Sequence, residues 1–211
     1  KKSSKKRERR EKVQKQQRQS KAQLQQRYLG KRRVSIGGIG IGHELAPEEG
    51  EVWCMNDLGT LRYTSMIWDM HDFEWTEEES WAQLKGVLGE EHPEEEIKDR
   101  MEKRVGRFVR IAEYCNKTNT PLMSVRKYDG SGRTGLDIPS SIGYPLEQVV
   151  KAVNSNFLNC SMAYAFAYAL MKGYTHVSTF GINVETVSEW VYQRDCVSYW
   201  LGRLEGAGIA V

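Results

Sequence analysis

The stretch VSIGGIGIG, residues 34–42, decides the fold class, because a short run rich in β-branched residues is followed there by several glycines. Such a run predicts a buried strand that ends in a tight turn. Because glycine has no side chain, a ligand can approach the backbone of this turn closely. In open α/β sheets ligands bind at the carboxyl ends of the strands, where a glycine loop offers backbone N–H groups to phosphate. The loop departs from G-x-G-x-x-G because His43 stands where the last glycine belongs. It is therefore interpreted either as a phosphate cradle or as a tight turn.

The chain after this loop alternates between short apolar runs and amphipathic segments. We expect further strands at Val52–Met55, Ile67–Met70, Pro121–Val125, His176–Phe180 and Ile209–Val211. We expect a helix that begins at Thr76–Glu79 and others ending at Asn116 or covering Pro145–Val153, Asn159–Lys172 and Glu185–Gly202. Glu90–Asp99 is interpreted as an acidic excursion, and Tyr128–Ser141 as a mobile loop. This alternation predicts an α/β domain over residues 34–211, with a mostly parallel sheet covered by helices on both faces.

Charge is divided unevenly along the chain. The net charge is +3, but residues 1–33 hold fifteen Lys and Arg against two Glu, which leaves +13 there and −10 on the rest. These 33 residues carry little apolar surface, so we expect a disordered or solvated helical arm. A basic arm on an acidic body is typical of a segment that binds nucleic acid or another polyanion, and the alternative is a solubilising tail. The residues expected to bind nucleic acid are Lys5, Lys6, Arg7, Arg9, Arg10, Lys31, Arg32 and Arg33.

The cysteines and the hydropathy pattern restrict the class of protein further. The four cysteines are far apart and form no CxxC pair, which favours buried free thiols in a reducing cytosol. No run approaches ~18 apolar residues, so no membrane span is expected. The basic N-terminal stretch has no apolar region behind it and is not a signal peptide. Because the sequence begins with Lys1 rather than Met, we expect it to start inside a longer chain.

Polar side chains follow the second and third expected strands. Asn56 and Asp57 are candidates for binding a ribose or sugar hydroxyl, and the alternative is an Asx turn or a helix cap. His71, flanked by Asp69 and Asp72, is a candidate general base or phosphate contact, and the alternative is a hydrogen-bonded structural residue. Successive side chains alternate in direction, so we do not expect a metal site at these three residues.

Arg194 is the cation that we expect to bind a phosphate or carboxylate, because its guanidinium offers a bidentate fork. A surface salt bridge is the alternative. Arg126 and Lys127, after the PLMSV strand, are further candidates for facing an anion. No Ser/His/Asp order, Cys/His pair or zinc spacing is present, so neither nucleophilic hydrolysis nor a structural metal is expected.

The motifs follow one another in a recognisable order, namely IGGIGIG, WCMNDL, WDMHD, NCSMAYAFAYALMKGYTHVSTFGINV and YQRDCVSYWLGRLEGAGIAV. This order resembles a Rossmann-like family common in tailed-phage genomes, and it is similar to bacterial sialyltransferase-like and DUF115-type proteins over residues 34–211. The resemblance implies a Rossmann-like fold with a nucleotide-sugar pocket. It also implies that Gly38, Gly40 and Asn56 contact the nucleotide, with Ser161 beside it. Where those transferases have G-I-D, this chain has Asn183 in place of the carboxylate.

The function that this resemblance implies is a phage-encoded group transferase that binds a nucleotide or nucleotide sugar. We expect glycosyl transfer in the modification of phage DNA, with a nucleotide sugar as donor, His71 as base and Arg194 on a phosphate. The alternative is a non-catalytic, virion-associated protein whose arm docks on packaged nucleic acid or a capsid partner. A third interpretation is an inhibitor of host defence that sequesters a nucleotide signal. The expected location is the host cytoplasm or the virion.

Overall fold

The structure is a computed structural model, and it describes residues 32–74, 78–79, 82, 93–182 and 191–211. The chain divides into two units, Lys1–Arg32 and Arg33–Val211. All the strands and helices named below for the described residues belong to the second unit.

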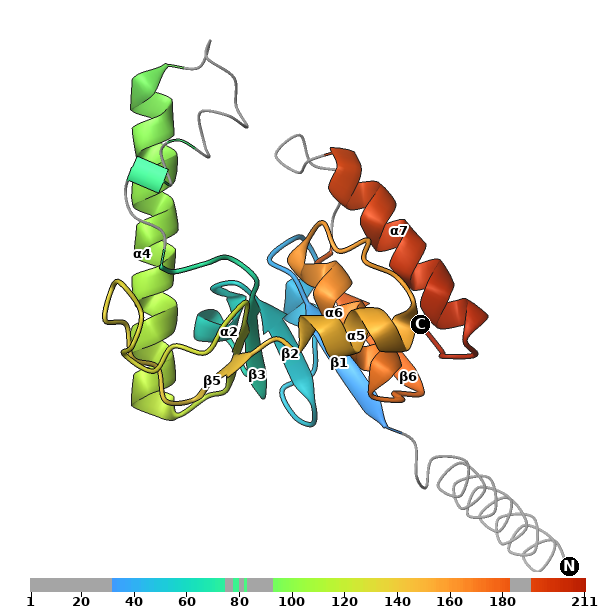
Figure 1. Cartoon of the computed structure of the whole chain (residues 1–211). Coiled ribbons are helices and arrows are strands. Elements are labelled where there is room, and N and C mark those ends of the chain that lie inside the picture. Colours follow the sequence, from blue (N-terminus) through green and yellow to red (C-terminus); the bar gives the residue numbers. More distant parts are fainter. Residues whose placement is uncertain (1–31, 75–77, 80–81, 83–92, 183–190) are drawn as a thin grey trace, which may run out of the picture. The chain divides into compact units, whose positions relative to one another are not determined.

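A parallel β-sheet forms the centre of this unit (Figure 1). Its strands are β1 (Arg33–Gly37), β2 (Val52–Met55), β3 (Met66–Asp69), β4 (Leu122–Ser124), β5 (Ser141–Gly143) and β6 (His176–Phe180). All neighbouring pairs are parallel, and the spatial order is β5-β4-β3-β2-β1-β6. The chain therefore moves outward from β1 to β5 and then crosses to the far side of β1. This is a Rossmann-like α/β topology with its switch point between β1 and β6.

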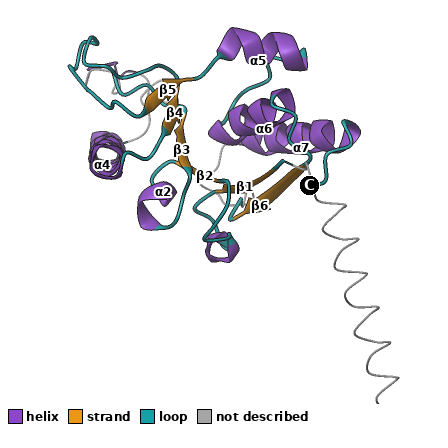
Figure 2. Cartoon of the chain, turned by 90° about the horizontal axis from the view of Figure 1, so that it is seen from below, coloured by secondary structure: helices purple, strands orange, loops and turns teal. Residues whose placement is uncertain are grey.

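Helices cover both faces of the sheet (Figure 2). One face carries α5 (Leu146–Val153), α6 (Ser161–Met171) and α7 (Val191–Gly206), and the other carries α2 (Leu58–Leu61) and α4 (Glu94–Thr118). A single 3₁₀ turn, η1 (His43–Leu45), lies in the connection between β1 and β2. The predicted fold class, an α/β sheet with helices on both faces, is confirmed.

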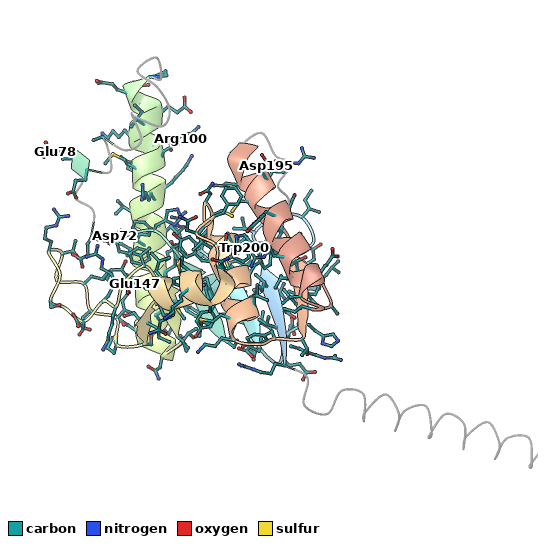
Figure 3. All side chains as sticks on the ribbon, turned by 45° about the vertical axis from the view of Figure 1, so that its right-hand side comes forward. Asp72, Glu78, Arg100, Glu147, Asp195 and Trp200 are labelled. Atoms are coloured by element: carbon teal, nitrogen blue, oxygen red, sulfur yellow. The ribbon has the colours of Figure 1, made fainter. Side chains whose placement is uncertain are left out.

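Side-chain alternation along the strands supplies one core to each face. Trp53 of β2 packs into the core under α5, α6 and α7, whereas Cys54 beside it packs with Leu58 of α2. Trp200 of α7, labelled in Figure 3, is fully buried in this core, and its indole N–H donates to the Phe157 carbonyl at 2.7 Å. Both faces of the sheet are covered, and the central strands β2, β3 and β4 accordingly read as near-continuous apolar runs.

Three stretches differ from the sequence-based expectation. Residues 94–99 form the first turns of α4 rather than an acidic excursion, because carboxylates are favourable near a helix N-terminus. A fifth strand, Ser141–Gly143, pairs with β4 where a loop was expected to end. The preceding loop is packed, since Tyr128 and Ile138 are buried and the buried Glu74 carboxylate accepts the backbone N–H of Thr134 at 2.8 Å.

Some expectations concern residues outside the described part of the chain. These are the helical or disordered state of residues 1–31, the helix start at 76–77 and the stretch 185–190. In place of the final strand, Ala210 forms a single parallel bridge with His176.

All four cysteines are free, three of them buried and Cys160 half-buried. Within the described residues, no helix has both the length and the apolar character that crossing a bilayer requires.

Candidate functional site

A polar cavity of about 370 Å³ opens where β2 and β3 end and α6 begins. The residues that line it come from five elements or their flanking loops, and they are Met55, Asn56, Met70, His71, Arg107, Leu158, Asn159, Cys160, Ser161, Met162, Tyr164 and Gln193. The cavity lies at the carboxyl edge of the parallel sheet, which is the edge where ligands bind in open α/β folds. Three of the residues predicted to contact a ligand, Asn56, His71 and Ser161, meet there.

A larger hollow of about 580 Å³ is lined by residues of α5, α6 and α7 and the loop after α7. Its walls are mostly small or apolar, and its one charged lining residue, Arg203, donates a hydrogen bond to the Val153 carbonyl. A ligand site needs a few converging polar groups. The smaller cavity has such groups, and the larger hollow does not.

Asn56 is held in an uncommon backbone conformation directly after β2. Its φ is +53°, in the left-handed region that asparagine tolerates better than most residues, and its backbone N–H donates to the Trp68 carbonyl at 2.8 Å. The side-chain Oδ1 is buried and has no hydrogen-bond partner within the described residues. An unsatisfied buried acceptor costs about 1–3 kcal/mol, so this oxygen is prepared to accept a ligand hydroxyl or amine. Asp57 faces elsewhere and pairs with Arg110 at 2.8 Å.

His71 and Asp69 form a hydrogen-bonded pair at the wall of the cavity. Asp69 is fully buried, and its Oδ1 accepts both the His71 backbone N–H at 3.0 Å and the ring Nδ1 at 2.5 Å. An ionised carboxylate only accepts hydrogen bonds, so the proton of a neutral His71 ring lies on Nδ1. Nε2 then carries a lone pair and makes no hydrogen bond within the described chain. This pair has the geometry of an oriented general base.

Arg107 reaches the same cavity from α4. Its side chain is 21% exposed, and its closest carboxylate contact joins Nε to Asp69 Oδ2 at 3.5 Å. Nε is buried without a hydrogen bond, and the guanidinium stacks over the Phe108 ring at 5.2 Å from the centroid. Asp69 therefore has His71 on one oxygen and Arg107 on the other. In the described part of the chain no three His, Cys, Asp or Glu side chains converge as a metal-binding group.

The opposite wall of the cavity is formed by the start of α6 and by apolar side chains. Ser161 is the first residue of this helix, whose alanines are fully buried and let it lie close to the sheet. Three thioether side chains, those of Met55, Met70 and Met162, supply a deformable apolar surface. Burial raises the pKa of the Cys160 thiol to about 12, so this lining residue is a neutral thiol at physiological pH.

The glycine loop lies at the switch point but does not line this cavity. The N–H groups of Gly38 and Gly40 donate to the carbonyls of Phe180 and Gly181, each at 2.8 Å. A Cβ on Gly38 would lie 2.7 Å from the Gly181 carbonyl oxygen and 2.8 Å from Met162 Cε. In this structure the glycines allow two loops to pack against each other, and both N–H groups are used in that contact.

Arg194 lies on α7 next to the cavity-lining Gln193, but its own side chain is exposed and does not line the cavity. Neighbouring helix residues point about 100° apart, which accounts for the difference. Of the basic residues assigned to nucleic-acid binding, Arg32 and Arg33 are described and exposed, and the others lie outside the described chain. Asn183 also lies outside it.

Sequence reasoning missed Arg107 and the positioning role of Asp69. A signal was present for each. Asp69 is an acidic residue at the end of an apolar run, on the same side of β3 as the buried Ile67. Arg107 precedes the buried Ile111 by one helical turn, so it lies on the face of α4 that meets the sheet.

Comparison with protein-family models, with curated proteins and with solved structures finds no match to this chain. The class of the protein is therefore defined by its fold and its cavity alone. It is a Rossmann-like α/β protein with a polar cavity at the carboxyl edge of its sheet.

Proposed function

We propose that this cavity binds a nucleotide or nucleotide sugar and that the protein transfers a group from it, with His71 as general base. One observation carries the proposal: Asn56, His71 and Ser161, from three separate parts of the chain, line one cavity at the carboxyl edge, and the buried Asp69 orients the His71 ring. A pocket with a few convergent polar groups on an apolar wall is the usual form of a small-molecule site. The resemblance described above adds the class of ligand.

In glycosyl transfer, His71 Nε2 accepts the proton of an acceptor hydroxyl as its oxygen bonds to the sugar carbon. The bond from that carbon to the leaving phosphate oxygen breaks, and its electron pair stays on the phosphate. The buried Asp69 carboxylate stabilises the imidazolium that forms and keeps the ring oriented. The Asn56 Oδ1 accepts a hydroxyl of the ligand, which satisfies a buried acceptor.

The test is a thermal-shift screen of the full chain against nucleosides, nucleotides and nucleotide sugars. A ligand at about 100 times its Kd adds about 2.7 kcal/mol of stability, which raises Tm by several degrees. We expect such a ligand, and we expect Asn56→Gly to weaken its binding. Glycine adopts the positive φ without strain, so the variant removes the amide alone.

Asn154→Gly is the matched control, because Asn154 also has a positive φ, of +49°, and caps α5 away from the cavity. Equal weakening by both variants, or no shift with any ligand of the panel, would contradict the proposal.

A second candidate function is non-catalytic binding of nucleic acid through residues 1–33, which the division of charge favours. Phosphate contacts by Lys and Arg make binding salt-dependent, with a slope of about −0.9 per contact on duplex DNA in a plot of log K against log salt concentration. Replacing Lys5, Lys6, Arg7, Arg9 and Arg10 by Gln should flatten that slope. The control replaces five exposed lysines of the body, Lys98, Lys103, Lys117, Lys151 and Lys172. Equal slopes for the two variants would exclude the arm as the contact.

A further inference from the structure

We infer that Arg107, with Arg104 beside it, binds a phosphoryl group of the ligand immediately next to His71. The inference rests on the proposed ligand cavity but not on the transfer reaction. It assigns the anion-binding role to α4, whereas the sequence pointed to Arg194 on α7.

The first reason is the state of the Arg107 guanidinium. It lines the cavity, is largely buried, and makes no hydrogen bond within the described residues. Its 3.5 Å contact with Asp69 Oδ2 is an ion pair without hydrogen-bond geometry. Buried donors without acceptors are unfavourable, and a tetrahedral oxyanion matches the guanidinium fork.

The second reason is a second cation close to Arg107. Arg104 lies about one turn away on α4, and both guanidinium groups contact the Phe108 ring, with distances of 5.7 and 5.2 Å to its centroid. Burial and the charge of Arg107 lower the pKa of Arg104, although the carboxylates of Asp69 and Asp72 act in the opposite direction. Asp72, labelled in Figure 3, is itself paired with Arg126 at 2.5 Å. Arg107 therefore has a second guanidinium within about one helical turn, which favours an anionic ligand at this place.

The third reason is the place of this charge relative to the base. A single buried carboxylate, that of Asp69, contacts His71 through one oxygen and Arg107 through the other. An oxyanion bound by Arg107 is thus held next to the His71 ring. The ligand is a small phosphorylated molecule, since the cavity measures about 370 Å³.

The experiment titrates the full chain with inorganic pyrophosphate by calorimetry, and in parallel with uridine diphosphate, uridine and a single-stranded oligonucleotide. Pyrophosphate and uridine diphosphate should bind, and Arg107→Gln should weaken both at least tenfold. Arg107→Lys keeps the charge but loses the fork, so it should weaken them by a smaller factor. It also serves as the second variant if Arg107→Gln fails to fold.

Arg110→Gln is the matched control, because Arg110 lies three residues further along α4, is 55% exposed and pairs with Asp57 outside the cavity. Pyrophosphate affinity that is equal in wild type, Arg107→Gln and Arg110→Gln would overturn the inference, and so would binding of the oligonucleotide alone. Uridine binding that persists in Arg107→Gln while phosphate binding does not supports it. Uridine that binds as tightly as the diphosphate overturns this inference and leaves the proposed function standing.

Discussion

Asp69 and Asp57 each pair with an arginine of α4, but the two ion pairs differ in burial. Asp69 is fully buried against Arg107, whereas Asp57 pairs with an Arg110 side chain that is 55% exposed. Removing one partner of a buried pair leaves an uncompensated buried charge and lowers the free energy of unfolding. Removing one partner of an exposed pair changes the free energy of unfolding little.

We therefore predict that Asp69→Asn lowers the free energy of unfolding by about 2–4 kcal/mol. Asp57→Asn should lower it by about 0–1 kcal/mol. Urea unfolding of the two variants at neutral pH measures both values. Similar losses would mean that the buried carboxylate does not have the structural role assigned to it here.

Cys115 gives a prediction for alkaline pH. Burial raises the pKa of its thiol from 9.0 to about 11. Between these values the unfolded chain has lost the proton and the folded chain keeps it, so the free energy of unfolding falls as pH rises through this window, by about 3 kcal/mol for this group. Cys115→Ala removes the titration, so the stability difference between wild type and variant should shrink from pH 9 to 11. Denaturation curves that give the same stability difference between wild type and variant at pH 9 and at pH 11 would contradict this prediction.

At the scale of elements, the contact between the loops after β1 and β6 closes the switch point of the sheet. Gly38→Ala should lower the free energy of unfolding by about 1–3 kcal/mol, because its Cβ would meet the Gly181 carbonyl at 2.7 Å. Gly202, within α7, has open space around its Cβ position, so Gly202→Ala should raise stability by about 1 kcal/mol. Thermal unfolding measures both changes, and a neutral Gly38→Ala would show that the two loops can separate without cost.

Four of the six strands lie within one residue of their predicted bounds, and β1 begins one residue before the predicted stretch 34–42. The strand Ser141–Gly143 has no apolar run, and its existence depends on pairing with β4, which local sequence does not show. The start of α4 was missed because its acidic first turn was interpreted as an excursion. Local patterns therefore predict the edge strand β6 as well as the central strands, but not the edge strand β5.

The candidate site was predictable where topology alone determines it. Parallel strands end at one edge, so Asn56 and His71 were expected there, and both line the cavity. The helical spacing puts Arg107 on the inner face of α4, but its place at the cavity depends on how α4 packs against β3 and β4, which local sequence does not show. The roles of Gly38 and Gly40 depend on the neighbouring loop of β6, about 140 residues away in the sequence.

For the molecule as a whole, the central claim is that ligand binds in the cavity beside His71 rather than at the glycine loop. Two histidines report on these two places. His71 lines the cavity, and the His43 ring contacts the Gly40 carbonyl at 3.0 Å. The chain has four histidines, so side-chain resonances of isotope-labelled histidine give a spectrum that can be assigned with His71→Gln and His43→Gln.

The measurement is that spectrum with and without a mixture of pyrophosphate and the adenosine, cytidine, guanosine and uridine diphosphates. We predict that the His71 resonances move while those of His43 and His176 stay in place, because His176 begins β6 at the opposite edge of the sheet. Movement of His43 with His71 unchanged would place the ligand at the glycine loop and contradict this account. A spectrum that the mixture leaves unaltered would contradict it as well.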